Sequence, residues 1–172
     1  PERQSEYKVA LARRFDEEAL LASLATDSQE SLDPDQVQGE AGKLIYSKHE
    51  DEILELLGSS VPEDALEFVQ DVHKESQGLL TYEEKKRLPS PASFSERKTL
   101  GRGVLSAFQS VIWRSLCDKD SDVYKMWLTN GMQAVLDKKY ITTAVIGALA
   151  GLKIGLYAVA AYLTALLIKI GI

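Results

Sequence analysis

Few side chains in this sequence are of the types that carry out nucleophilic or metal-assisted chemistry. The chain has two histidines, His49 and His73, and one cysteine, Cys117. A single cysteine forms no intramolecular disulfide and cannot build a zinc site with several cysteine ligands. His49 also lacks the second histidine, four residues away, that a helical zinc motif needs. The sequence therefore predicts no catalytic residue, no metal site and no cofactor, and we expect a protein that is not an enzyme.

The rival interpretation is a hydrolase that uses carboxylates of the acidic amino-terminal half. Asp51 and Glu55 with a metal ion are its strongest candidates. The acidic residues are spread along the segment as a solvated face rather than gathered beside a nucleophile and a base. This distribution favours the non-enzymatic interpretation.

Charge is ordered along the chain. Residues 1–85 contain 21 acidic and 8 basic residues, residues 86–140 contain 5 and 10, and residues 141–172 contain only two lysines. An acidic part, a basic middle and an apolar end are typical of a protein whose basic stretch lies on an anionic membrane and whose end enters the bilayer. In the alternative interpretation, the basic residues only cap helices and form their solvated faces.

The net charge of −6 argues against nucleic acid as the main partner. Candidate contacts to lipid phosphates are Arg97, Lys98, Arg102 and Arg114.

Apolar residues recur at spacings of three and four almost throughout, which predicts an all-helical fold. We expect residues 1–137 to form a bundle of five or six helices, with an internal boundary at 88–93, where Pro89 and Pro91 interrupt regular helix. Helices are expected over 6–25, 34–57, 61–78, 81–88 and 94–116, followed by one that carries Val123, Trp127, Gly131 and Ala134. Four start signals support these helices: Asp33 before Pro34, Ser60 with Glu63, Thr81 with Glu84, and Ser93 with Glu96.

Residues 141–168 are mostly apolar and contain a single charged residue, Lys153. A helix of this length runs to about 42 Å, which exceeds the roughly 30 Å of a bilayer core. Burying Lys153 there costs about 2.5–3.5 kcal/mol, whereas the Ile, Leu and Val residues together favour insertion by about 5 kcal/mol. We therefore expect a continuous transmembrane helix within residues 138–172. Lys138, Lys139 and Tyr140 would then lie at the membrane interface, with the bundle on the cytoplasmic side.

The two sides of this expected helix differ. Small residues lie on one side, where they allow two helices to approach closely in lipid; they are Ala144, Gly147, Ala148, Gly151, Gly155 and Ala158. Roughly opposite lie Lys153, Tyr157 and Thr164, which would face a lumen or a partner. This division predicts a homo-oligomer in the membrane.

These features predict a non-enzymatic, membrane-anchored helical protein. Its apolar helix would oligomerise in lipid and act as a pore-forming or membrane-disrupting effector controlled by the helical domain, which also binds a protein partner. Two alternatives stay open. The apolar segment can serve as a plain anchor, or the chain can be a soluble adaptor or a subunit of a larger complex in which that segment is buried.

Overall fold

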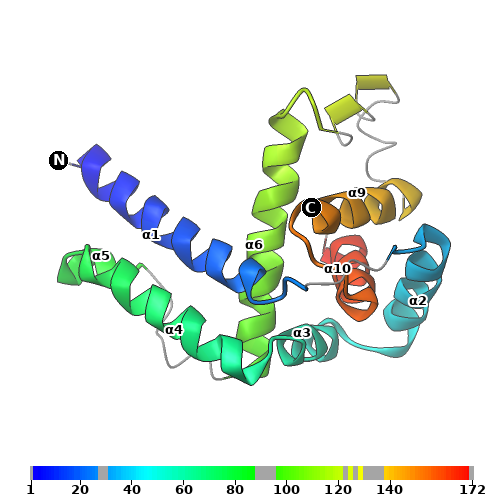
Figure 1. The fold of residues 1–172 in the computed structure, drawn as a ribbon, viewed down its shortest axis with the longest axis horizontal. Helices are drawn as coiled ribbons and strands as arrows, with labels where there is room; N and C mark the ends of the chain where they lie inside the picture. The colour runs from blue at the N-terminus through cyan, green and yellow to red at the C-terminus, as the bar shows by residue number, and fades with distance from the viewer. Residues whose placement is uncertain are drawn as a thin grey trace.

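The computed structural model describes residues 2–26, 31–87, 96–121, 124–125, 128–129 and 138–170. The described residues contain helices and no strand, which confirms the all-α fold class (Figure 1). The helices with described bounds are α1 (Glu2–Ala22), α2 (Pro34–Ser47), α3 (Glu50–Ser59), α4 (Glu63–Gly78), α5 (Tyr82–Lys85), α6 (Arg97–Cys117), α9 (Lys138–Gly151) and α10 (Tyr157–Ile170). The boundary expected at 88–93 and the helix expected to carry Val123, Trp127, Gly131 and Ala134 lie outside the described residues.

Two helix starts follow the capping signals of the sequence. The carboxylate of Asp33 accepts a hydrogen bond from the Asp35 N–H at 2.9 Å, and Pro34 is the first residue of α2. At α5, the Thr81 N–H donates to Glu84 Oε1 at 3.0 Å, while the Glu84 N–H donates to Thr81 Oγ1 at 3.3 Å. Both starts are confirmed, because the side chains satisfy N–H groups that have no partner within the helix.

Two expected boundaries are wrong. The helix expected over 34–57 is divided, because α2 ends at Ser47 and α3 begins at Glu50. Ser60 does not start α4, since its hydroxyl donates back to the Leu56 carbonyl at 3.1 Å and Pro62 takes the capping position instead.

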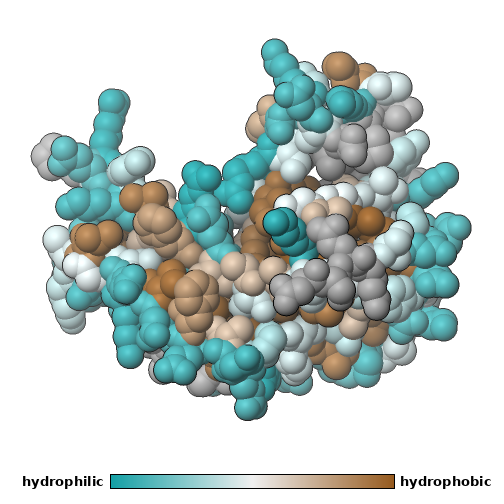
Figure 2. All heavy atoms as spheres, in the orientation of Figure 1, coloured by the Kyte–Doolittle hydropathy of each residue, from teal (hydrophilic) through white to brown (hydrophobic). Residues whose placement is uncertain are grey.

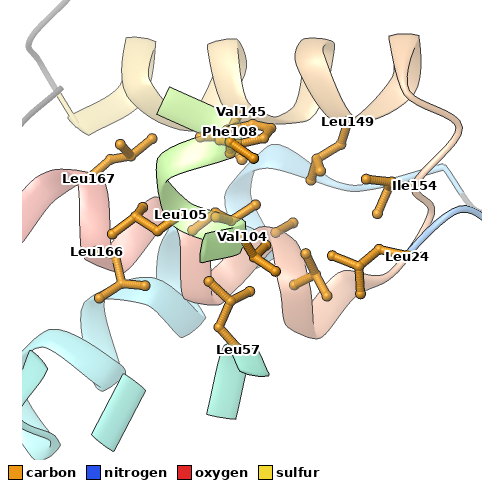
Figure 3. Close-up of a cluster of buried hydrophobic side chains, with 14 of the residues drawn as sticks. Leu24, Leu57, Val104, Leu105, Phe108, Val145, Leu149, Ile154, Leu166 and Leu167 are labelled. Carbon is orange, nitrogen blue, oxygen red and sulfur yellow. The ribbon is translucent and has the colours of Figure 1, made fainter. Parts of the chain in front are cut away.

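The helices form an arm and a main body (Figure 1). In the arm, α1 packs along α4 and touches α5, around a small cluster of Val9, Ala12 and Leu80. In the main body, α3 crosses α6, and α10 packs against α2, α3 and α9. Figure 3 shows how this body is filled: Val145 and Leu149 of α9 face a core that also holds side chains of α6, α3 and α10. The C-terminal segment is thus part of the core.

The continuous carboxy-terminal helix predicted from the sequence is wrong. α9 ends at Gly151, the chain turns, and α10 begins at Tyr157, so the segment is a helical hairpin. At the turn, the Ile154 N–H donates to the Leu149 carbonyl at 2.9 Å, and both side chains are buried. This hydrogen bond and apolar contact are those of a Schellman helix end. Among the described residues, we find no helix with both the length and the apolar character needed to cross a bilayer.

Candidate functional site

α10 is enclosed by the rest of the protein on most of its surface. Its buried residues follow one another almost without a break and include no charged side chain; they are Val159, Ala160, Ala161, Leu163, Thr164, Ala165, Leu166 and Leu167. A helix that is apolar on all sides is stable either inside a protein core or inside a bilayer. α2, α3 and α9 supply the core environment in this fold.

The turn between α9 and α10 contains a strained residue. Lys153 has a backbone φ of 60°, in the left-handed region that side chains with a Cβ rarely adopt. This conformation costs about 1–2 kcal/mol for a residue other than glycine. The Lys153 side chain is exposed, so it gains no burial in return. The turn, residues 152–156, is hereafter called the hinge.

The hinge is held by one residue from the connection between α1 and α2. The Thr26 N–H donates to the Lys153 carbonyl at 2.9 Å, and the Gly155 N–H donates to Thr26 Oγ1 at 3.1 Å. Thr26 therefore satisfies backbone groups on both sides of the point where the chain reverses. We call this pair of hydrogen bonds the Thr26 clamp.

Two polar contacts tie α10 to α2. The Tyr157 hydroxyl donates to the Gln36 carbonyl at 2.8 Å, near the beginning of both helices. At the other end, Lys169 Nζ donates to the Lys48 carbonyl at 2.9 Å. The first contact joins the amino-terminal ends of α2 and α10, and the second joins their carboxy-terminal ends. The two helices therefore run parallel, and their register is fixed at both ends.

The small-residue stripe predicted from the sequence is split by the hairpin. Ala144 and Gly155 are buried, Ala148 is half-buried, and Gly147, Gly151 and Ala158 are exposed. A Cβ added at Gly147 or Gly151 would meet no atom of the described residues within 4 Å. The stripe is thus not a tight packing surface of this fold, and its α9 part lines a groove of about 430 Å³ beside α6.

The residues expected on a common polar face are also separated. Lys153 and Tyr157 lie on the surface, whereas Thr164 is completely buried in α10. Among the described residues, Thr164 Oγ1 has no hydrogen-bond partner. Of the expected interface residues, Lys139 is exposed and Tyr140 half-buried at the start of α9, and the Lys138 side chain lies outside the described residues.

The candidate contacts to lipid phosphates lie on α6, where two acidic residues form ion pairs with three of them. Arg97 pairs with Glu63 of α4 at 3.3 Å. Lys98 and Arg102 pair with Asp51 of α3 at 2.9 and 3.8 Å. The hydrogen bond from Lys98, more than any other contact, holds the pKa of Asp51 below its usual value. Arg114 is exposed near the other end of the helix. The four cations therefore form no single basic surface.

Asp51 and Glu55, the two carboxylates of the hydrolase interpretation, have different surroundings. Asp51 is engaged by the cations of α6, and Glu55 lies beside a small surface groove on α3. Among the described residues, the histidine, cysteine and acidic side chains form no group of three suited to a metal ion.

The sequence analysis missed a buried polar pair. His73 Nδ1 of α4 and Asp16 Oδ2 of α1 are 2.6 Å apart, and the two residues are 0% and 5% exposed. His73 Nε2 also lies 3.0 Å from the side-chain amide of Gln77. His73 is therefore a buried, hydrogen-bonded residue. The signal was the position of Asp16, which lies four residues after Ala12 on the apolar side of the first helix.

The apolar hairpin with its hinge and clamp is the part of the chain that best supports a functional interpretation. It combines burial of most of α10, backbone strain at Lys153 and hydrogen bonds that tie both ends of α10 to α2. Comparison of the chain with protein families, with curated proteins and with solved structures finds no match.

Proposed function

We propose that this protein is a non-enzymatic, membrane-active helical protein. It keeps the α9–α10 hairpin inside its fold and inserts this segment into a bilayer when the hinge straightens. The observation that carries the proposal is the burial of α10, the most apolar helix of the chain, behind a strained and clamped hinge.

Straightening would make the segment long enough for a bilayer. α9 and α10 have 14 residues each, which is about 21 Å of helix, shorter than the roughly 30 Å of a bilayer core. A single helix over residues 138–170 would be about 50 Å long. It would also return Lys153 to a helical φ and remove the backbone strain.

The balance of energies explains why the hairpin stays folded in water. Four large apolar side chains of α10 are buried to 1% exposure or less: Val159, Leu163, Leu166 and Leu167. Each contributes about 1.5–3 kcal/mol when removed from water, so together they outweigh the 1–2 kcal/mol of strain at Lys153 several times over. Release therefore requires a bilayer that replaces the lost burial.

The proposal gives the exposed part of the small-residue stripe a role after insertion. Gly147 and Gly151 are open in the folded state and would let inserted helices approach closely. Lys138 and Lys139 precede the apolar segment in the sequence and would remain at the cytoplasmic surface together with the helical bundle.

Flotation with anionic vesicles tests the proposal. The full chain should float with vesicles that contain phosphatidylglycerol and should release an encapsulated dye. Thr26→Val removes the hydroxyl of the Thr26 clamp, so it should lower the lipid concentration needed for both effects. Thr143→Val is the matched control, because the Thr143 hydroxyl bonds only within α9. A folded monomer that stays at the bottom of the gradient and releases no dye would overturn the proposal.

Oligomerisation has a separate test. Gly151→Leu places a leucine side chain on the stripe, whereas Ala150→Leu places one beside it, at another exposed position of α9. Only Gly151→Leu should reduce the size of the oligomer in membranes. Equal oligomer sizes for the two variants would remove the stripe from the proposal.

A second candidate function is an adaptor that binds a protein partner through the arm. Large side chains are exposed there, among them Tyr7, Leu79 and Tyr82. Figure 2 shows hydrophobic surface scattered among hydrophilic residues over α1, α4 and α5. This function would be favoured if the protein did not bind vesicles.

A further inference from the structure

A cleft of about 660 Å³ lies between α1 and α6, away from the hairpin. α1 and α6 diverge from the point where they touch (Figure 1). Its volume is within the range of sites that hold small molecules. The α6 wall contains Thr99, Ser106 and Ser110, and the polar residues of the α1 wall are Arg13, Asp16 and Glu17.

Among the residues that the structure describes, the cations that line the cleft are all arginines. Arg13 comes from α1, Arg102 from α6, and Arg87 follows α5. Only 7 of the 20 cationic residues of the chain are arginine. The described lining, with three arginines and no lysine, is therefore richer in arginine than the chain as a whole. Arginine offers a planar fork of N–H donors that matches the oxygens of a phosphate group. Arg13 and Arg87 form no ion pair with the described residues.

A buried carboxylate in the same cleft has an unused acceptor. Asp16 is 5% exposed, and its Oδ2 is held by His73 at 2.6 Å. Its Oδ1 is buried and has no hydrogen-bond partner among the described residues. Buried carboxylate oxygens without a donor are rare, because the lost hydration costs about 1–3 kcal/mol. Asp16 therefore holds an unused acceptor in the wall of the cleft, which a ligand hydroxyl reaches only by displacing the atoms that cover Oδ1, and His73 fixes the orientation of the carboxylate.

We infer that this cleft binds a small phosphate ester that also carries hydroxyl groups, with the phosphate on the arginines and a hydroxyl donating to Asp16. The inference is independent of the membrane function. The lining residues argue for both parts of this ligand. Guanidinium groups alone would bind any anion, whereas the Asp16 oxygen favours a ligand that also carries a hydrogen-bond donor.

Calorimetric titration with ribose 5-phosphate, inorganic phosphate and ribose tests the inference at constant ionic strength. Ribose 5-phosphate should bind more tightly than either of the other two. Arg13→Gln and Arg102→Gln should each weaken its binding by about tenfold or more, the loss of one charged hydrogen bond. Arg14→Gln is the matched control, since the neighbouring Arg14 is absent from the cleft lining and pairs with Glu18.

The role of Asp16 has its own readout. Asp16→Asn should weaken the binding of ribose 5-phosphate more than that of inorganic phosphate, because an amide oxygen is a weaker acceptor than a carboxylate and only the ester carries alcohol hydroxyl groups beyond its phosphate. If Asp16→Asn disturbs the fold, Arg13→Gln and Arg102→Gln, at exposed positions, still decide the matter. No binding of ribose 5-phosphate at about 10 mM, a free energy weaker than about 3 kcal/mol, would overturn the inference. Equal losses for Arg13→Gln and Arg14→Gln would overturn it as well.

Discussion

Gly58 of α3 and Gly101 of α6 lie opposite each other where the two helices cross, at backbone contact. A Cβ at Gly58 would lie 1.8 Å from the Arg97 carbonyl oxygen, and a Cβ at Gly101 would lie 1.9 Å from the Leu54 carbonyl oxygen. Backbone atoms cannot move aside as a flexible side chain can. The two glycines therefore set the distance between α3 and α6.

Gly58→Ala should destabilise the fold by about 3 kcal/mol or more, because the helices must separate along their whole contact. Urea unfolding followed by circular dichroism measures the change. Gly39→Ala is the control: it lies in α2 with nothing within 4 Å of the added Cβ. That change should stabilise the protein by about 0.5–1 kcal/mol, and equal effects at the two glycines would contradict the close crossing.

Thr164→Val should stabilise the folded protein. The substitution keeps the shape of the side chain and removes a buried hydroxyl that has no partner among the described residues. We expect a gain of about 1 kcal/mol in the free energy of unfolding. Thr143→Val, at an exposed position of α9, should change it by less than about 0.5 kcal/mol. A loss of stability in Thr164→Val would mean that the hydroxyl is satisfied.

Lys153→Gly should stabilise the hairpin by about 0.5–1 kcal/mol, since glycine adopts a positive φ without strain. Lys153→Ala removes the same side chain but keeps the Cβ, so it should give no such gain. Hydrogen exchange at the Ile154 and Gly155 amides reports the local effect. Equal protection in the two variants would show that strain at Lys153 does not control the hinge.

Ser5→Ala should raise the pKa of Glu84. The pKa of this carboxyl lies below its usual value because the Ser5 hydroxyl donates to it, followed by the backbone N–H of Thr81. A pKa lowered by folding means that stability is present above the unfolded pKa and is lost as the pH falls through the folded pKa. Carbon NMR titration should show a rise for Glu84 and none for Asp51, whose partner is Lys98. An unchanged Glu84 pKa would remove Ser5 as its main cause.

The sequence predicted those features that depend on neighbouring residues. The starts of α2 and α5 follow from Asp33 and from Thr81 with Glu84, because capping groups act over two or three residues. The contact between Asp16 and His73 joins residues 57 positions apart, so no local pattern indicates it.

The hairpin was missed for a physical reason. An apolar run such as residues 141–168 suits a bilayer and a protein core equally well, because both remove it from water. Only packing against α2 and α3 decides where the run bends. In the sequence, Gly155 is only weak evidence for a bend. Lys153, which adopts the positive φ, is not a residue type that predicts one.

The most direct test of the proposed function is the distance between the two ends of the hairpin in membranes. Spin labels at Thr143 and Ile170, both exposed, can be placed in a Cys117→Ser background. In the folded protein Thr143 lies in the first half of α9 and Ile170 at the end of α10, and the chain reverses between them, so their separation should be short. In protein recovered with anionic vesicles, a straight helix would separate the two positions by about 40 Å. Pulsed electron resonance measures both states. An increase to this distance supports insertion by straightening, and an unchanged short distance in vesicle-bound protein would contradict it.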